Sequence, residues 1–253
     1  MRNIISDLKH TIYSTWRESP EVLGVCLYGS AARGELDDFS DIDLLVVISN
    51  DMPFPEIKKL KERFCRVMGE GSLNRISPAV YYQGDLKSMV ERRSLFILHL
   101  QLEGKKIFEK ECCLSFMSFD PISYSGFDND IEIYIENCYG VGEALELATN
   151  SIQVDFELSV LAGLVRNASI SYTASIGRPF FGRYEAFHYL KNYLGLKHKL
   201  SSADLRQLCG ARFKIDRGLA ANEGTQAPLK LQKKCLNFLE MIKFERRWHA
   251  GKI

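Results

Sequence analysis

The chain has 253 residues, of which 46% are hydrophobic and 26% charged, so it falls among globular proteins and outside the disordered and fibrous classes. Its 33 basic and 32 acidic residues leave a formal net charge of +1, which excludes the overall basic field of a non-specific nucleic-acid binder. Seven cysteines without a repeated C-x-x-C spacing argue against a zinc site and a disulfide framework. Since no segment approaches ~20 apolar residues, we expect a cytoplasmic protein without membrane contact.

The first 110 residues alternate between helical and strand patterns. Leu8, Ile12 and Trp16 recur at helical spacing in the opening segment, and the next apolar run stops at a Gly-Ser pair, as a buried strand entering a turn does. Pro78 places the third predicted strand at a sheet edge or bulge, because proline cannot donate a ladder hydrogen bond. In chain order, we expect helix 4–16, strand 22–28, strand 41–48, helix 56–68, strand 75–82, helix 85–101 and strand 104–108.

From about residue 128 onward only helical patterns remain. Helices are predicted over 131–149, 154–175, 184–194, 201–208 and 229–247. Ser202, ahead of Asp204, is the expected N-cap of the fourth. The composition changes over 112–130, so we expect one domain over 1–115 and a second over 126–253. The predicted fold class is α+β: a small mixed β-sheet domain flanked by helices, followed by an all-α helical bundle.

The motif that carries chemistry begins at Gly29 and Ser30, where the first predicted strand ends. Glycine lets the backbone approach a phosphate closely, and the serine hydroxyl and following N–H groups can donate to it. After a ten-residue spacer, Asp41 and Asp43 project from the same side of the second strand, with the residue between them pointing into the core. Such carboxylates repel each other unless a cation lies between them, and they suit Mg²⁺, which also takes substrate phosphates. Arg33 is a fork-shaped donor within reach of the same phosphates.

Taken singly, a Gly-Ser pair after a strand is commonly a turn, and an Asp-x-Asp pair is commonly a solvated strand end. The ordered combination is more specific, and residues 27–47 resemble the signature of the DNA polymerase β-like nucleotidyltransferase superfamily, most of all its minimal bacterial members. The same signature occurs in aminoglycoside adenylyltransferases. The resemblance implies that Gly29 and Ser30 hold the triphosphate of an NTP and that Asp41 and Asp43 hold Mg²⁺ or Mn²⁺.

One feature departs from the superfamily pattern. Its active members usually carry a third carboxylate on a later strand, where it binds metal and acts as a base toward the acceptor hydroxyl. The corresponding strand, 75–82, contains no acid, and Ser77 stands at the expected position. Two acids could substitute for the third carboxylate: Asp85, just past the strand, and Glu70, just before it. Each lies several residues from the expected position.

The helical half is similar to the helical domains appended to such transferases. Arg178, Arg183 and Tyr184 have two interpretations: they contact a nucleotide or an acidic acceptor, or they belong to a salt-bridged loop with Phe180 and Phe181 packed as core. The five histidines lie apart from one another in the sequence and from any acidic or cysteine cluster, so we expect them to be structural.

Three functional hypotheses follow. The first is a metal-dependent nucleotidyltransferase that moves a nucleoside monophosphate, by resemblance AMP from ATP, to an acceptor hydroxyl and releases pyrophosphate. The acceptor is a small molecule, a protein or an RNA end, and the balanced charge disfavours RNA. The second is a regulatory protein that binds nucleotide but has lost turnover together with the third carboxylate. The third is a helical interaction module in which the Gly-Ser turn is incidental.

Overall fold

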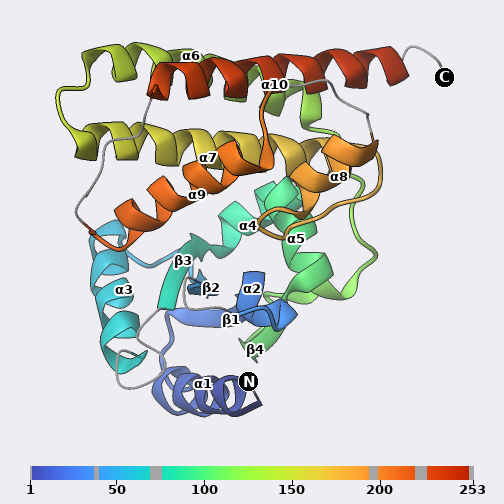
Figure 1. Ribbon diagram of the computed structural model, residues 1–253. Coiled ribbons are helices and arrows are strands. Elements are labelled where there is room, and N and C mark those ends of the chain that lie inside the picture. Colours follow the sequence, from blue (N-terminus) through green and yellow to red (C-terminus); the bar gives the residue numbers. More distant parts are fainter. Residues whose placement is uncertain (1, 37–39, 69–75, 194–198, 220–226, 251–253) are drawn as a thin grey trace. The chain divides into compact units, whose positions relative to one another are not determined.

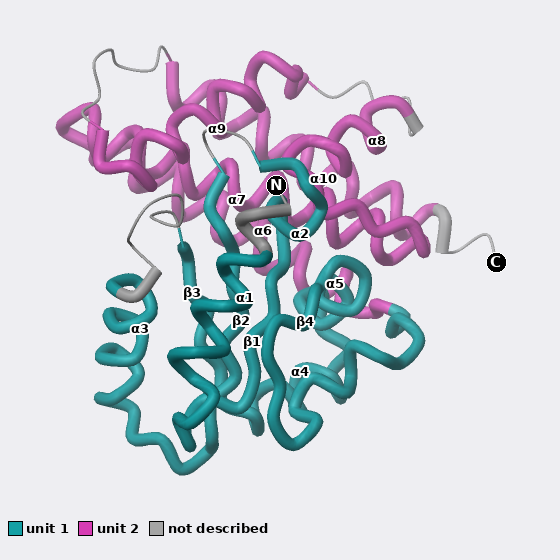
Figure 2. Tube along the Cα trace, turned by 90° about the horizontal axis from the view of Figure 1, so that it is seen from below, with its two compact units in different colours: residues 1–123 teal, residues 124–253 magenta. Residues whose placement is uncertain are grey.

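The computed structural model describes residues 2–36, 40–68, 76–193, 199–219 and 227–250. The chain divides into two compact units, unit 1 over residues 1–123 and unit 2 over residues 124–253, coloured separately in Figure 2. Unit 1 contains a four-stranded sheet with helices, whereas the described part of unit 2 is helical. The α+β fold class expected from the sequence is therefore confirmed.

The sheet of unit 1 has the strand order β3-β2-β1-β4. Its strands are β1 (Val22–Tyr28), β2 (Ile42–Ile48), β3 (Ile76–Tyr82) and β4 (Lys105–Glu109). β1 runs antiparallel to both β2 and β4, and β2 runs parallel to β3, so the sheet is mixed as predicted. Pro78 lies in β3 at the sheet edge, where the hydrogen bond that proline cannot donate is not needed by a further strand.

Two apolar clusters form on the two faces of this sheet because alternate side chains point to opposite sides. The first, the α1/α3 core, joins Ile42, Leu44 and Val46 to helices α1 (Arg2–Trp16) and α3 (Phe54–Met68), and in it Trp16 stacks on Phe64 with ring centroids 4.3 Å apart. The second, the α4/α5 core, joins the alternate strand residues to α4 (Gln83–Glu91), α5 (Leu95–Glu103) and the short 3₁₀ helix η2 (Ser115–Ser118). Figure 1 shows these helices around the sheet.

The single helix predicted over 85–101 is wrong: the structure has two helices, α4 and α5, separated by a turn. Arg93 adopts a left-handed φ of 51°, which interrupts the helical hydrogen bonds. Ser94 then caps α5, because its side chain accepts a hydrogen bond from the backbone N–H of Ile97. The turn falls in the polar run over residues 91–94, which contains neither glycine nor proline, and apolar residues resume directly after it, so periodicity alone did not reveal it.

Unit 2 is built around one buried helix. Its helices are α6 (Phe127–Leu147), α7 (Ser151–Ser175), α8 (Glu185–Tyr193), α9 (Ser202–Asp216) and α10 (Pro228–Ala250). The other four helices all pack against α7, whose C-terminal half is almost completely buried. Ser169 and Thr173 are fully buried there, and their hydroxyls donate to carbonyls of their own helix, so their burial leaves no unmet hydrogen bond.

The N-cap of α9 is Ser201 and not Ser202 as predicted. The Ser201 hydroxyl accepts from the N–H of Asp204 at 3.1 Å, and the Asp204 carboxylate accepts from the N–H of Ser201 at 2.7 Å, which makes a complete capping box. The helix also continues to Asp216, well past the predicted end at residue 208. None of the described helices combines the length and apolar character needed to span a bilayer.

Candidate functional site

The Gly29-Ser30 turn begins directly where β1 ends and opens the five-residue helix α2 (Gly29–Arg33). Gly29 has a φ of +70°, a left-handed conformation that residues with a Cβ rarely adopt. Gly34, with a φ of 85°, closes the helix, and the backbone N–H groups of Gly34 and Glu35 both donate to the carbonyl of Ser30. The turn is thus fixed by a glycine at each end.

The aspartate of the second strand lies directly against this turn. A Cβ atom placed on Gly29 would overlap the Oδ2 atom of Asp43, so the carboxylate occupies the space that any other residue at position 29 would fill. The strand register explains the approach, since Tyr28 of β1 is paired with Asp43 of β2. Ile42 is buried in the α1/α3 core, as predicted. Asp43 is two residues before Leu45 and four before Val47, so its side chain lies with theirs on the opposite face of the sheet.

Asp41 is half-buried and immediately precedes β2, which begins at Ile42. Continued alternation places it on the same side as Asp43, and this remains a prediction. Two carboxylates fit the requirement of Mg²⁺, which typically takes one or two of them and completes its shell with water and substrate phosphates. Within the described ranges, no three histidine, cysteine or acidic side chains gather as a metal site.

Ser77 is the β3 residue paired with Asp43 across the parallel β2–β3 ladder. Paired residues of neighbouring strands share a face, so Tyr28, Asp43 and Ser77 form one row across three strands. The position beside Asp43 on β3 therefore carries a hydroxyl and no carboxylate.

Asp85 and Glu70 are the two acids that could supply the third carboxylate. Asp85 is exposed and lies beyond the far end of β3, where Tyr82 pairs with Ile48. That end is five residues from the pair that contains Asp43, about 16 Å at 3.3 Å per residue. Asp85 is therefore too distant to complete the site. Glu70 lies outside the described residues.

Burial raises the pKa of the Tyr28 hydroxyl, and the negative charge of Asp43 raises it further. Tyr28 is accordingly a neutral hydroxyl near neutral pH, and it lies close enough to Asp43 for the charge of that carboxylate to act on it. Its ring makes edge-to-face contacts with Phe96 and His99 of α5, each with centroids 5.6 Å apart. The residue before the Gly-Ser turn is therefore packed against α5.

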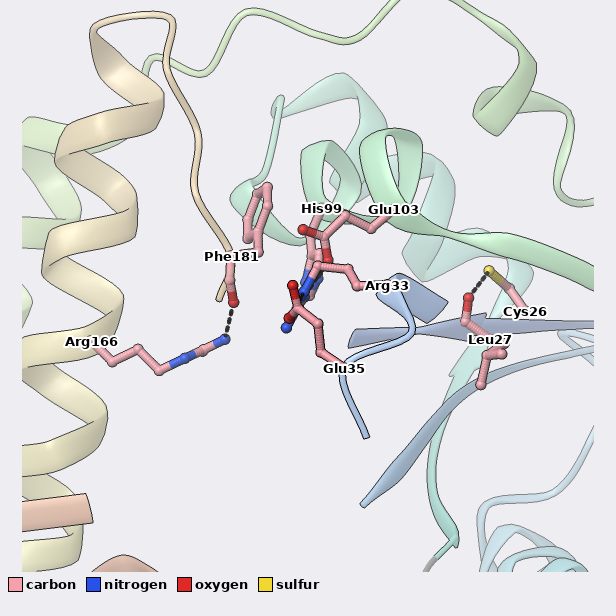
Figure 3. A network of polar contacts seen from close by, with 8 residues as sticks. All are labelled: Cys26, Leu27, Arg33, Glu35, His99, Glu103, Arg166 and Phe181. Atoms are coloured by element: carbon pink, nitrogen blue, oxygen red, sulfur yellow. Dashed lines mark hydrogen bonds and ion pairs between the residues drawn. The ribbon is translucent and has the colours of Figure 1, made fainter. Parts of the chain in front are cut away.

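Arg33, proposed from the sequence as a phosphate ligand, lies in a network of ionic groups (Figure 3). Its Nε atom is 2.7 Å from Glu35 Oε2, and its Nη1 atom is 2.5 Å from Glu103 Oε2. Burial alone would lower the pKa of Arg33, but its hydrogen bonds to Glu35 and Glu103 outweigh this and raise it. A phosphate that approaches Arg33 would share the guanidinium with these carboxylates.

Glu103 also accepts a hydrogen bond from His99, with Nε2 and Oε2 2.9 Å apart. Burial raises the pKa of Glu103, yet the hydrogen bonds and charges of His99 and Arg33 together lower it below its usual value. Sequence reasoning missed this pair because it treated every histidine as isolated. The signal was present: His99 and Glu103 are four residues apart, which places them on one helix face.

Unit 2 has a separate group of arginines around a half-buried thiol. Burial raises the pKa of Cys209, whereas a hydrogen bond to Tyr184 and the charges of Arg183, Arg212 and Arg166 lower it, and burial prevails. Arg166 donates to the carbonyl of Phe181 at 2.9 Å, with both residues drawn in Figure 3, and Arg212 is 3.5 Å from Asp216. The charges of three guanidinium groups thus act on the Cys209 thiol.

The two interpretations of the 178–184 segment each find partial support. Phe181 is 4% exposed and belongs to the core, while Phe180 is half-buried and packs against Tyr189 with centroids 5.0 Å apart. Arg178 donates to the hydroxyl of Tyr189 at 3.4 Å, whereas Arg183 takes part in the arginine group. The aromatic residues are therefore structural, and Arg183 remains a candidate ligand.

Comparison with known proteins identifies the first unit. Residues 10–112 match the family described as "Polymerase beta, Nucleotidyltransferase". A stretch of 58 residues is 40% identical to spectinomycin 9-adenylyltransferases of Staphylococcus aureus, covering 22% of this chain and 22% of each relative, so less than a quarter of those proteins is matched.

The arrangement of the chain also has a counterpart among solved structures. The crystal structure of spectinomycin adenyltransferase AAD(9) from Enterococcus faecialis, with ATP and spectinomycin, aligns over 96% of this chain and 99% of that one, with a TM-score of 0.51 and 12% identity. Identity this low supports similarity of fold alone. Residues 10–112 thus form a polymerase β-like nucleotidyltransferase domain, and a helical C-terminal region follows that domain.

Proposed function

We propose that the protein transfers a nucleoside monophosphate, AMP from ATP, to an acceptor hydroxyl and releases pyrophosphate. The observation that carries this proposal is the contact between the left-handed Gly29 and the carboxylate of Asp43. It brings the Gly-Ser turn and an acidic group of the neighbouring strand together. A site for a nucleoside triphosphate and its cation needs those two parts side by side.

Each residue has a distinct role in the proposal. Gly29 lets the backbone approach the phosphates, the Ser30 hydroxyl donates a hydrogen bond to them, and Asp41 and Asp43 hold Mg²⁺ or Mn²⁺. Bound metal supplies charge neutralisation at the phosphate oxygens.

The arginine group of unit 2 fits an anionic substrate. Guanidinium groups bind phosphate or carboxylate oxygens in a two-pronged geometry, and the charges of Arg166, Arg183 and Arg212 all act on Cys209. Such a group suits a substrate that carries a phosphate chain.

A small hydroxylated molecule is the acceptor class that we propose first. The support is the similarity to spectinomycin adenylyltransferases, both in a 58-residue stretch and in fold. Spectinomycin is accordingly the first acceptor to test.

The experiment incubates the protein with ATP, Mg²⁺ or Mn²⁺ and a panel of acceptors that begins with spectinomycin, and measures pyrophosphate release. Asp43→Asn should abolish release, because an amide is a poor ligand for a hard cation. Asp51→Asn makes the same chemical change at an exposed residue after β2 and serves as the matched control. Release that survives Asp43→Asn would refute the assigned site.

Ser77 gives specific support to a second candidate, a nucleotide-binding regulatory protein without turnover. Because Ser77 stands beside Asp43 in the β2–β3 register, that position offers no carboxylate to accept the proton of an acceptor hydroxyl. Metal-dependent ATP binding without pyrophosphate release, for any acceptor or in a cell lysate, would establish this second candidate in place of the first.

A further inference from the structure

Two side chains of α5 tie that helix to the Gly-Ser turn. Glu103 and His99 are 14% and 12% exposed, and one oxygen of Glu103 accepts hydrogen bonds from both Arg33 and His99. Charges so shielded from water interact more strongly than exposed ones, and removing one partner leaves the other poorly solvated. Glu35, the other carboxylate on Arg33, is 54% exposed and therefore holds the guanidinium less firmly.

The turn needs an external support of this kind. The helix that it opens, α2, has only five residues, and a helix so short has too few internal hydrogen bonds to be stable alone. Its buried residues are Gly29, Ala31 and Ala32, which have small side chains or none and therefore give little packing. α5 contacts both ends of the segment: His99 touches the ring of Tyr28 before the turn, and Glu103 binds Arg33 at the end of α2.

We propose that Glu103 and His99 are positioning residues that fix Arg33, and through it the turn of Gly29 and Ser30, in the conformation that receives the triphosphate. The inference rests on the proposed function and adds to it two residues outside the signature. Glu103 acts through Arg33 and has no contact with substrate. His99 directs the Glu103 carboxylate by donating to the oxygen that binds Arg33.

The structure supplies a readout that does not depend on nucleotide. The backbone N–H groups of Gly34 and Glu35 donate to the carbonyl of Ser30, so the amide hydrogens of this segment are protected while the turn is fixed. If Glu103 fixes the turn, Glu103→Gln should speed hydrogen exchange at these two amides in the absence of any ligand. The same variant should raise the Kd for MgATP roughly 10- to 100-fold, the usual cost of removing a group that orients a ligand.

The matched control is Glu56→Gln. Glu56 pairs with Lys59 at 2.7 Å on α3, so the variant removes an exposed ion pair of similar length away from the turn. It should change neither exchange at Gly34 and Glu35 nor the Kd, as exposed pairs contribute little. A double variant tests whether Glu103 acts through Arg33. In a protein that already carries Arg33→Ala, Glu103→Gln should have no further effect on the Kd for MgATP.

The results separate this inference from the proposed function. If the wild-type protein binds no MgATP, the proposed function fails, and hydrogen exchange alone decides whether Glu103 fixes the turn. Unchanged hydrogen exchange at Gly34 and Glu35 in Glu103→Gln overturns the inference. So does a loss of MgATP affinity on Glu103→Gln that is equally large in the wild-type protein and in Arg33→Ala. Should Glu103→Gln fail to fold, Glu103→Asp retains the charge but shortens the side chain, and it must show the same faster exchange for the inference to stand.

Discussion

Replacement of Gly29 by alanine tests the geometry of the site directly. The new methyl group brings two costs. A residue with a Cβ in the left-handed region loses roughly 1–2 kcal/mol, and Gly29 has a φ of +70°. The overlap with Asp43 Oδ2 adds about 1–3 kcal/mol, the usual cost of forcing an extra methyl group into a filled space. The expected loss is therefore about 2–5 kcal/mol, below the 5–15 kcal/mol stability typical of a folded domain.

Gly177→Ala separates the two costs. Gly177 has a φ of +73°, almost the same as Gly29, but nothing lies within 4 Å of a Cβ placed there. This variant should lose only the conformational part, about 1–2 kcal/mol. The double variant Gly29→Ala with Asp43→Ala removes the overlapping carboxylate and should recover about 1–3 kcal/mol relative to additivity.

The assay uses the tryptophans, of which the chain has two. Trp16 is fully buried in unit 1, whereas Trp248 is 55% exposed in unit 2. In a Trp248→Phe background, Trp16 fluorescence during urea denaturation reports the unfolding of unit 1, which contains Gly29 and Asp43. Gly177 belongs to unit 2, so the loss in Gly177→Ala is measured by Trp248 fluorescence in a Trp16→Phe background. If Gly29→Ala shows no coupling to Asp43→Ala in this assay, the carboxylate does not lie against the turn, and the site as described is wrong.

Three further predictions concern other parts of the chain. Ser77→Asp should raise pyrophosphate release by at least about 10-fold, because it places a base beside Asp43, whereas Ser88→Asp on an exposed face should not; equal rates would show that the base lies elsewhere. Alkylation at pH 8 should modify exposed thiols quickly and spare those whose pKa burial raises to about 12, as mass spectrometry of the labelled protein can show. The fast thiols are Cys65 and Cys112, and the spared ones are Cys26, Cys113 and Cys138. Because the folded-state pKa of Glu103 is lowered, the stability it contributes is present above its unfolded pKa and is lost as pH falls through the folded value; an acid titration of stability in Glu103→Gln should lack this loss.

The sequence alone determined most of the elements of unit 1 and the resemblance of its signature to the nucleotidyltransferase superfamily. The strand predicted over 22–28 matches β1 residue for residue, and Pro78 indicated an edge or a bulge for the third strand, which lies at the edge as β3. These features depend on local chemistry: alternation, β-branched runs and the missing N–H of proline act within a few residues. The division of 85–101 into two helices was missed because Arg93 breaks the helix through its backbone φ and not through a glycine or proline.

The candidate site was likewise predicted from the sequence only in part. The Gly-Ser and Asp-x-Asp pairs were visible as a spacing, but only the β1–β2 register brings Asp43 against Gly29, and only the β2–β3 register puts Ser77 beside Asp43. The link between Arg33 and Glu103 joins residues 70 positions apart, and no local pattern encodes it. Short-range propensity determines which segments become strands and helices. Burial and strand pairing across the folded unit determine which distant side chains meet, and in this protein they decided both the environment of the aspartate and the support of the turn.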